Sequence, residues 1–492
     1  MAFHSRVYAA TMVVLLQFWL GPVSRILADS PDESAGRKPN VLFIAVDDLR
    51  PELDCYGAKT ITPNIDRLAE TGLLFERAYC NQAVCGASRV SLMTSLYPEF
   101  TGERTYHVTD WRKRWQHIVT LNQHFTANGY KTVGLGKIYH GSGGPGVDPD
   151  NWSEWVKVDG KGYADPASWR NIRESRGRKR GPSTESADVD DDAYADGARA
   201  KTGAQRLRQL AKGSEPFFLA VGFTKPHLPF NAPTKYWDLY ERSSFRLPDN
   251  SGRPPGYPAY AANVNAGELR SYSDVPLKGL PADFPDELNK RLLHGYHACV
   301  SYTDRNIGQL LETLEESGAA ENTIVVLWAD HGWKLGDHSS WCKHTNFECD
   351  TKVPLIIRHP QIETARGRTT ALAELIDLYP TLCELCGLSI PEHVQGKSLL
   401  PVLKDPQADH RRAAYSSYPH RANSRKNVVG HSIRTAQYRY TEWWARDTDE
   451  VVDSVLTDIE KDPAETTAID DQPKLKARLS KLLHERVLAA RK

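Results

Sequence analysis

Charged and imidazole side chains follow four short apolar segments of this chain, and together they could perform metal and acid–base chemistry. In chain order they are Asp47 and Asp48, Lys137 and His140, Lys225 and His227, and Asp330 and His331. If the apolar segments are parallel strands of one sheet, their carboxyl ends meet in one crevice, where open sheets bind ligands. Desolvating so many charges in one place would be costly without a function.

The acidic members of this set favour a metal centre. Asp47, Asp48, Asp330 and His331 offer oxygen ligands and one imidazole. Hard divalent cations such as Ca²⁺ and Mg²⁺ prefer oxygen ligands, whereas structural zinc sites are rich in thiolates. Asp47 and Asp48 alone could be a capped turn, but together with Asp330 and His331 they predict a bound cation.

A second motif, CGASRVSLMTS over Cys85–Ser95, places a cysteine just before a predicted helix. The first turn of a helix offers backbone N–H groups and a positive dipole to an anion, and Arg89 can bind two oxygens of that anion. The Cys-x-x-x-Arg spacing is shorter than the Cys-x5-Arg spacing of thiol phosphatases. A thiolate is also a poor partner for a hard metal. The motif therefore predicts an anion-binding site of another kind.

Short buried strands that alternate with helices predict an α/β fold, with a mostly parallel central sheet sandwiched by helices. The expected strands are Val41–Val46, Thr132–Leu135, Phe217–Phe223, Thr323–Ala329 and Pro354–Ile357. The expected helices are Pro63–Gly72, Ser88–Ser95, Leu121–Asn128, Pro285–Glu316 and Leu372–Cys386.

The end of the chain predicts a smaller C-terminal α+β subdomain. The polar segment Pro401–Asn427 is expected to be a linker. Val428–Glu442 and Val451–Ile459 favour a hairpin or small antiparallel sheet, and Pro473–Ala490 favours a final helix. We therefore expect a catalytic domain over residues 29–410 and the subdomain over residues 411–492.

The segment His140–Ser186 is rich in Gly, Asp, Arg and Ser and is expected to be a surface insertion. It contains a basic run of Arg173, Arg176, Arg178, Lys179 and Arg180. The insertion is either a solvated loop or a surface that contacts a polyanion.

The composition excludes several classes of protein. With 62 Lys+Arg, 62 Asp+Glu and 40% hydrophobic residues, the chain is not disordered, collagen-like or a polytopic membrane protein. Zero net charge argues against a nucleic-acid partner. Residues 1–28 place basic His4 and Arg6 before apolar Tyr8–Leu20, which predicts a signal peptide; an uncleaved anchor is the alternative. We expect a secreted or periplasmic protein without stable membrane insertion.

Eight cysteines in a chain of 492 residues do not make a disulfide scaffold. Cys383 and Cys386 have redox-motif spacing, but their apolar helical context favours buried core thiols. Cys342 and Cys349 could pair in an oxidising compartment.

The sequence resembles the type I sulfatases of the alkaline phosphatase superfamily, specifically the iduronate-2-sulfatase branch, over nearly the whole mature chain. The matching segments are NVLFIAVDDLRP (Asn40–Pro51), the Cys85 motif, Gly136–Lys137 with His140, VGFTKPHLPF (Val221–Phe230), DHGWKLGD (Asp330–Asp337) and HSIRTAQYRYTEW (His431–Trp443). In that family a maturation enzyme reads Cys-x-Pro/Ala-Ser-Arg and oxidises the cysteine to formylglycine. Ala87 is a tolerated variant of this motif, and Ser95 replaces the glycine that usually closes it.

The resemblance implies a sulfuric ester hydrolase that holds one Ca²⁺ and a formylglycine derived from Cys85. The implied metal ligands are Asp47, Asp48, Asp330 and His331 with an oxygen of residue 85. The hydrated aldehyde would attack sulfur, and Arg89, Lys137 and Lys343 would hold the charge on the equatorial oxygens. His227 would be the general acid, assisted by Lys343, and His140 would be the base.

Some of these assignments leave alternatives open. His140 could support the site instead of acting as the base, and His338 or His344 could take part. Trp333 and Arg434 either shape the substrate pocket or are packed in the core. The implied substrate is a sulfated carbohydrate, with the 2-O-sulfate of a uronic acid foremost.

Three other functions compete with this one. They are another glycan or choline sulfatase, a phosphatase or phosphonate monoester hydrolase of the same superfamily, and a non-catalytic carbohydrate-binding relative. A two-metal phosphatase needs a second His/Asp cluster and a Ser/Thr nucleophile, neither of which is apparent in the sequence. An intact set of nucleophile, acid and base argues against a binding module.

Overall fold

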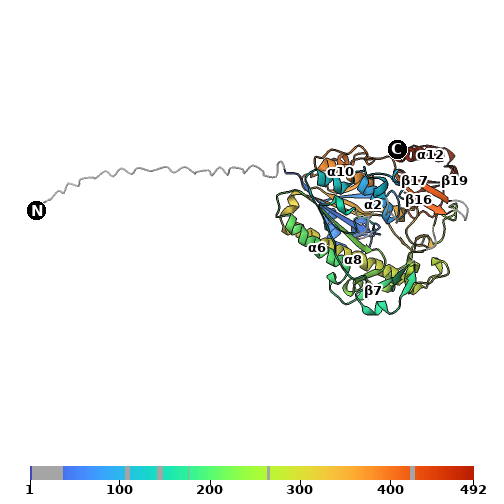
Figure 1. Ribbon diagram of the computed structural model, residues 1–492, viewed down its shortest axis with the longest axis horizontal. Coiled ribbons are helices and arrows are strands. Elements are labelled where there is room, and N and C mark those ends of the chain that lie inside the picture. Colours follow the sequence, from blue (N-terminus) through green and yellow to red (C-terminus); the bar gives the residue numbers. More distant parts are fainter. Residues whose placement is uncertain (3–36, 106–110, 141–147, 176, 263–265, 422–426) are drawn as a thin grey trace. The chain divides into compact units, whose positions relative to one another are not determined.

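The computed structural model describes the chain except for residues 3–36, 106–110, 141–147, 176, 263–265 and 422–426 (Figure 1). The chain divides into two units, Met1–Arg37 and Lys38–Lys492, and all elements below belong to the second. The predicted signal peptide falls almost entirely outside the described residues and stays a prediction. Among the described residues, no helix has the length and apolar character needed to cross a membrane.

A mixed sheet, nine-stranded in the described part of the chain, forms the centre of the second unit. Its parallel part runs, in spatial order, through β10 (Thr323–Ala329), β1 (Asn40–Asp47), β8 (Phe217–Pro226), β3 (Lys131–Gly136) and β4 (Glu154–Val156). The central strands are runs of buried apolar residues, because both of their faces are covered.

On the other side of β10 the strand directions alternate. β14 (Leu355–Arg358) is antiparallel to β10, β2 (Leu73–Tyr79) is antiparallel to β14, and β13 (Lys352–Val353) is antiparallel to β2. β15 (Gly367–Glu374) pairs with β2 in parallel. The prediction of a mostly parallel sheet is confirmed, with an antiparallel part at one edge.

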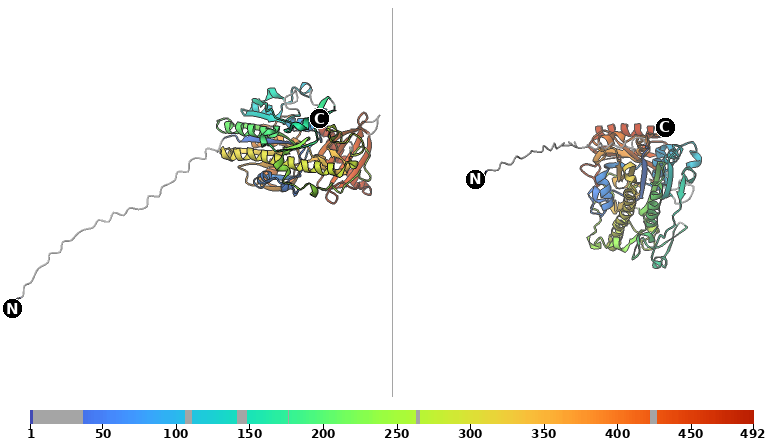
Figure 2. Two further views of the ribbon diagram at one scale, coloured as in Figure 1. Left: turned by 90° about the horizontal axis from the view of Figure 1, so that it is seen from below. Right: turned by 90° about the vertical axis from the view of Figure 1, so that its left-hand side faces the viewer.

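Helices cover both faces of this sheet. α6 (Ala195–Leu210) and α8 (Asp286–Glu316) lie on one face, and α2 (Cys85–Thr94) and α10 (Leu378–Leu385) lie on the other (Figures 1 and 2). α1 (Pro63–Thr71) packs beside α8, and α5 (Leu121–Ala127) packs beside α2. The predicted sandwich of helices around a sheet is therefore confirmed.

The end of the chain forms a second, antiparallel sheet with a helix. Its strands are β16 (Ala414–Arg421), β17 (Asn427–Arg434), β18 (Tyr438–Ala445) and β19 (Val451–Asp458), and the helix is α12 (Pro473–Ala490). Ile433 of β17 and Leu483 of α12 belong to an apolar cluster that also contains Tyr97 and Ile376. The C-terminal sheet thus shares a core with segments that flank α2 and α10.

Two predicted elements were wrong. The predicted helix Leu372–Cys386 begins with the last residues of β15, and its helical part, α10, starts only at Leu378. Pairing with β2 decides this segment, since strand formation depends on neighbours more than on local pattern. The predicted linker Pro401–Asn427 contains the short helix α11 (Leu400–Lys404) and strand β16.

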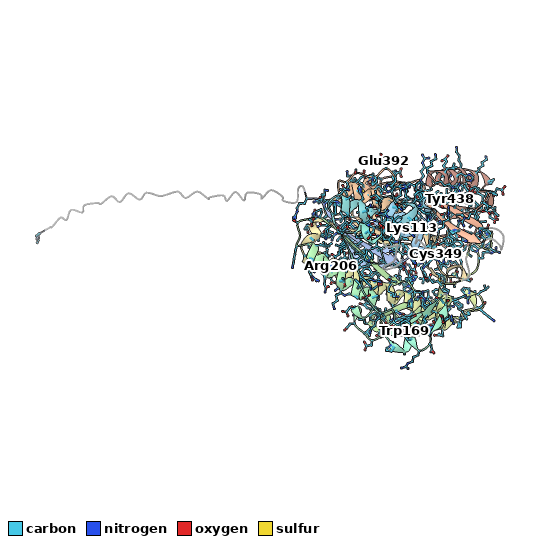
Figure 3. All side chains as sticks on the ribbon, viewed as in Figure 1. Lys113, Trp169, Arg206, Cys349, Glu392 and Tyr438 are labelled. Atoms are coloured by element: carbon cyan, nitrogen blue, oxygen red, sulfur yellow. The ribbon has the colours of Figure 1, made fainter. Side chains whose placement is uncertain are left out.

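The predicted surface insertion is largely ordered in its described part. β5 (Arg173–Ser175) and β6 (Arg178–Arg180) form a hairpin, and β7 (Thr184–Ala187) pairs with β9 (Phe230–Pro233). Trp169, in the same insertion, is half exposed (Figure 3). The Arg173 guanidinium donates hydrogen bonds to backbone carbonyls of residues 270, 272, 273 and 275, so this member of the basic run braces a neighbouring loop.

The cysteines, all of them within the described residues, are unpaired. Cys383 and Cys386 are buried in the main core, as predicted. Cys342 and Cys349 form no disulfide, so that suggestion was wrong for this structure.

Candidate active site

The structure brings the strand-end carboxylates together in the middle of the sheet. Asp47 is the last residue of β1, and Asp48 follows it with a φ of 60°. β1 lies between β10 and β8, so Asp330 and His331 arrive from the next strand. Ligand atoms of four buried side chains all lie within 4.8 Å of one another: Asp47, Asp48, Cys85 and His331.

Asp330 links this cluster to the turn after β1 and to α2. Its Oδ1 accepts hydrogen bonds from the backbone N–H groups of Asp48 (3.2 Å) and His331 (3.0 Å). Its Oδ2 lies 2.8 Å from Arg89 Nε and 3.6 Å from His331 Nε2. The five predicted ligand positions therefore form one buried group.

The donor set fits a hard divalent cation. Among the described residues, the buried Asp47 Oδ1 has no hydrogen-bond partner, and Arg89 Nη2 lies 3.6 Å away. Burial by itself would raise the pKa of Asp47, but Lys137, His227 and Arg89 hold it well below the usual value. A buried, charged oxygen without a hydrogen bond is costly unless another positive group binds it. Three carboxylates and one imidazole match the ligands that Ca²⁺ or Mg²⁺ would take.

The Cys85 side chain is a poor nucleophile as a thiol. Cys85 is the first residue of α2, is 2% exposed, and its Sγ lies 3.2 Å from His331 Nε2. Burial, together with the charge of Asp47, raises the pKa of the thiol well above its usual value. The thiol is therefore neutral near pH 7, and only the thiolate is reactive.

The start of α2 is anchored to the metal-ligand cluster. Ser88 Oγ donates a hydrogen bond to the carbonyl of Asp330 (2.6 Å). Arg89 is fully buried and donates to the carbonyls of Lys137 and Ile138 as well as to Asp330. Lys137, which follows β3, donates to Asp47 Oδ2. These contacts place two cations beside residue 85, where an anion would bind.

His227 and Lys343 both contact Asp48. His227 Nδ1 lies 2.5 Å from Asp48 Oδ2 and 3.4 Å from Asp47 Oδ2. Lys343 Nζ donates to both oxygens of Asp48, at 2.9 and 3.1 Å. Burial alone would lower the pKa of Lys343, but Asp48 and other acids raise it well above the usual value. Lys343 is therefore protonated.

His140 is neutral at physiological pH. Burial and the positive charge of Lys137 lower the pKa of His140 to about 3. A neutral imidazole is the form that can accept a proton. This property matches the role of base that the resemblance implies.

Two residues of the site had not been predicted. Glu268 precedes the short 3₁₀ helix Leu269–Ser271; its Oε1 lies 3.2 Å from His227 Nε2 and its Oε2 lies 3.0 Å from Lys343 Nζ. Tyr296 of α8 donates to the Asp48 carbonyl (2.9 Å) and accepts from the Arg50 N–H (3.1 Å), which stabilises the turn after β1. Neither residue belongs to a sequence motif, and both reach the site only through packing.

The remaining candidates divide between this site and another region. Trp333 is fully buried, with its ring 4.8 Å from Lys343 Nζ and 6.5 Å from the ring of His227, so it packs against both. His344 is half-buried, and desolvation with the charge of Lys343 lowers its pKa to about 3. Among the described residues, both are neighbours of the cluster.

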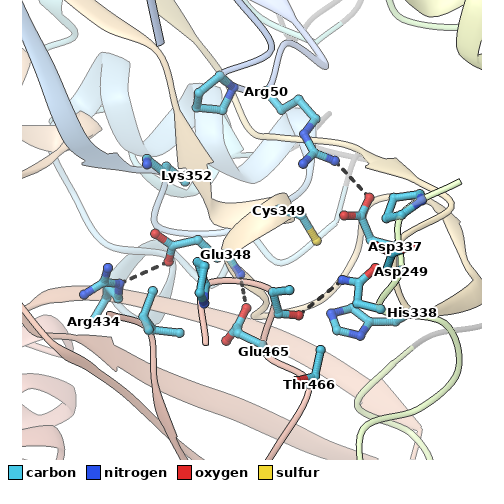
Figure 4. Close-up of a pocket in the computed structure, with 16 residues that line it drawn as sticks. Arg50, Asp249, Asp337, His338, Glu348, Cys349, Lys352, Arg434, Glu465 and Thr466 are labelled. Atoms are coloured by element: carbon cyan, nitrogen blue, oxygen red, sulfur yellow. Dashed lines mark hydrogen bonds and ion pairs between the residues drawn. The ribbon is translucent and has the colours of Figure 1, made fainter. Parts of the chain in front are cut away.

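Arg434 and His338 lie in another region, away from the metal-ligand cluster. Both line a separate cavity of about 680 Å³ between the segment Glu348–Lys352 and the C-terminal sheet (Figure 4). Arg434 Nε is paired there with Glu348 (3.2 Å). None of the predicted metal ligands or catalytic residues is among the described residues that line this cavity.

The chain matches two protein-family models that together span nearly all of the second unit. The Sulfatase model matches residues 39–388, and the model for the C-terminal part of N-sulphoglucosamine sulphohydrolase matches residues 336–492. Human iduronate 2-sulfatase is 33% identical over 489 residues, which cover 84% of this chain and 86% of that protein.

Solved structures share the fold. A 2-O GAG sulfatase superposes with a TM-score of 0.72 at 22% identity, and the match covers 93% of each chain. A phosphonate monoester hydrolase from Silicibacter pomeroyi superposes with a TM-score of 0.73 at 22% identity, over 92% of this chain and 94% of the other. The fold is thus common to enzymes with different substrates. The family-model match and the curated relative show that this chain belongs to the sulfatase family, whose members hydrolyse sulfate esters.

Proposed function

We propose that this sulfatase removes sulfate from carbohydrate, and that its substrate carries a 2-O-sulfated uronic acid. The observation that carries the reaction is the position of Cys85, whose Sγ lies among buried carboxylates at the start of α2 beside Arg89. The similarity to an iduronate 2-sulfatase over most of both chains supports the choice of substrate.

Cys85 is the proposed site of formylglycine, formed by a maturation enzyme, and Ca²⁺ is the proposed cation. Asp47, Asp48, Asp330 and His331, with an oxygen of residue 85, would hold the cation. When both groups are present, they supply an oxygen nucleophile with a lowered pKa in place of the neutral thiol.

The other side chains hold charge and move protons. Arg89, Lys137 and Lys343 surround residue 85 with positive charge and are proposed to bind the sulfuryl oxygens. His227 is the proposed general acid, because its Nδ1 faces Asp48 and leaves Nε2 to reach the ester oxygen. His140, neutral and close to Lys137, is proposed to accept the proton released when sulfate leaves.

The predicted signal peptide supports a secreted or periplasmic location, where sulfated polysaccharides are accessible. The partners proposed are the substrate and the maturation enzyme. Neither the charge balance nor the site suggests nucleic acid.

The proposal is tested by making the protein with and without a formylglycine-generating system. Peptide mass spectrometry should detect formylglycine at residue 85 only in the first preparation. The rate of desulfation of a 2-O-sulfated uronoside should rise in proportion to the fraction of Cys85 that is converted to formylglycine. Cys349→Ser is the control, since Cys349 lies outside the site and should leave both readouts unchanged. Full activity with an unmodified Cys85 would refute the mechanism, and activity on choline sulfate alone would refute the substrate.

A further inference from the structure

Glu268 occupies a position that the proposed reaction does not explain. Its carboxylate connects the two proposed proton donors, at 3.2 Å from His227 Nε2 and 3.0 Å from Lys343 Nζ. His227 and Lys343 both contact Asp48 as well, so Glu268 lies across this pair from the metal-ligand cluster. The Glu268 side chain is 25% exposed, whereas Asp48 is fully buried. Glu268 is therefore on the solvent side, from which a substrate must arrive.

The loop that carries Glu268 is firmly held. Leu269 is fully buried, and the Ser271 N–H and hydroxyl both donate to the carbonyl of Glu268. Arg173 of β5 donates hydrogen bonds to four carbonyls of the following residues. These contacts hold the backbone from Glu268 onward, and the ion pairs with His227 and Lys343 hold the Glu268 carboxylate. A preorganised carboxylate at the mouth of a site is suited to recognition.

A substrate must compete with Glu268 for His227. Because His227 Nδ1 faces Asp48, only Nε2 can reach the ester oxygen of the leaving group, and Nε2 now faces Glu268. When that oxygen takes the place beside Nε2, Glu268 loses one donor. A largely buried carboxylate without a replacement donor costs free energy, and the sulfate ester itself has no hydrogen to donate.

We propose that Glu268 is a specificity-determining residue that accepts a hydrogen bond from a hydroxyl group on the carbon next to the sulfated carbon. This inference rests on the proposed carbohydrate substrate and refines it. The hydroxyl group on the neighbouring sugar carbon lies beside the ester oxygen. It can therefore donate a hydrogen bond to Glu268 in place of His227 Nε2. An aryl sulfate offers no such donor. Glu268 therefore selects alcohols of the vicinal-diol type.

The test compares matched substrates on wild-type enzyme, Glu268→Gln and Glu268→Ala. The substrates are a methyl 2-O-sulfo-iduronide, its 3-deoxy analogue and nitrophenyl sulfate. The wild-type enzyme should prefer the hydroxylated sugar over the deoxy analogue by roughly 10- to 100-fold in kcat/KM, as for a hydrogen bond to a charged group. Glu268→Ala should lose this preference, and its kcat/KM should fall more on the hydroxylated sugar than on the 3-deoxy analogue or on nitrophenyl sulfate. Glu70→Gln, on the exposed face of α1, is the matched control.

Each other outcome contradicts the proposal in a recognisable way. If Glu268→Ala keeps the wild-type preference for the hydroxylated sugar, Glu268 does not read that hydroxyl. An equal loss on the sugar and on nitrophenyl sulfate would make Glu268 a positioning residue for His227 and Lys343. If wild type prefers choline sulfate and Glu268→Ala removes that preference, the carboxylate serves a cation. Wild type that cleaves nitrophenyl sulfate but no sugar sulfate refutes the carbohydrate substrate itself, whatever Glu268 does.

Discussion

Asp48 determines which atom of His227 can donate a proton. The contact of 2.5 Å between Asp48 Oδ2 and His227 Nδ1 leaves Nε2 as the nitrogen that faces the substrate side. The carboxylate also orients the ring, as carboxylates do for catalytic histidines. Lys343 Nζ donates a hydrogen bond to the same carboxylate. At the residue scale, the two proposed proton donors, His227 and Lys343, are therefore held by one carboxylate, that of Asp48.

Replacing His227 should affect poor leaving groups most. A sugar alkoxide needs protonation as it leaves and a nitrophenolate does not, so His227→Ala should lower kcat on a 2-O-sulfated uronoside by ~100- to 10,000-fold. Hydrolysis of nitrophenyl sulfate should fall much less. Arg89→Ala should reduce both activities, because Arg89 is proposed to bind sulfuryl oxygens common to the two substrates.

Steady-state kinetics on both substrates decide this prediction. His117→Ala, at an exposed histidine, serves as the control. An equal loss on both substrates with His227→Ala would show that His227 binds sulfate or supports the structure, and the acid would then be sought at Lys343 or His344.

At the scale of elements, the segment after β19 is held to α9 (Glu348–Thr351) by one buried acid. Glu465 Oε2 accepts the N–H of Glu348, and its Oε1 lies 2.9 Å from Arg439 Nε of β18. Burial outweighs Arg439 and raises the pKa of Glu465 from 4.5 to about 7. The proton that Glu465 keeps in the folded state links the stability of this contact to pH.

The direction of the pH effect follows from the raised pKa. Below about pH 4.5, Glu465 is protonated in both the folded and the unfolded protein, and its stabilising contribution is fully present. This contribution is lost as the pH rises to about 7, because the folded protein then buries a charged carboxylate. Glu465→Gln cannot titrate, so its Tm relative to wild type should rise between pH 5 and pH 8, by an amount corresponding to at most roughly 3 kcal/mol. Glu460→Gln, exposed in the same segment, should show no such trend. A Tm difference that is constant with pH would contradict the prediction.

At the scale of the whole second unit, the proposed cation would join three separate parts of the fold. Asp47 ends β1 and Asp48 follows it, Asp330 and His331 follow β10, and residue 85 begins α2. A ligand that binds only the folded protein stabilises it by mass action. The metal would therefore contribute to stability as well as to catalysis.

Chelation should remove both contributions. Exhaustive EDTA treatment should abolish sulfatase activity and lower Tm by roughly 2 to 5 °C, as loss of a ligand at about 100-fold over its Kd would. Ca²⁺ should restore both, and Zn²⁺ should not. Asp48→Ala should make Tm insensitive to EDTA, whereas Asp238→Asn, an exposed acid, should behave as wild type. Stoichiometric zinc in the active enzyme, or activity that survives chelation, would contradict the assignment of Ca²⁺.

The sequence by itself determined the central strands and the residues that end them. Runs such as Val41–Val46 and Thr323–Ala329 are apolar because both faces are covered, and that requirement is visible in the local sequence. Asp47 and Asp330 were predicted to meet because parallel strands end at the same edge. The motif around Cys85 was equally local, although the helix begins at Cys85 itself and not at Ser88.

Only the tertiary structure decided the features that depend on contacts between distant segments. Residues 372–374 have a helical pattern but form a strand because β2 offers hydrogen bonds. Glu268 lies in a loop without a motif and reaches His227 because Arg173 and a buried Leu269 hold that loop. Arg434, in a matching segment, faces a separate cavity because Glu348 binds it there. Side-chain direction in loops and at sheet edges is set by neighbours far along the chain, so no local pattern contains it.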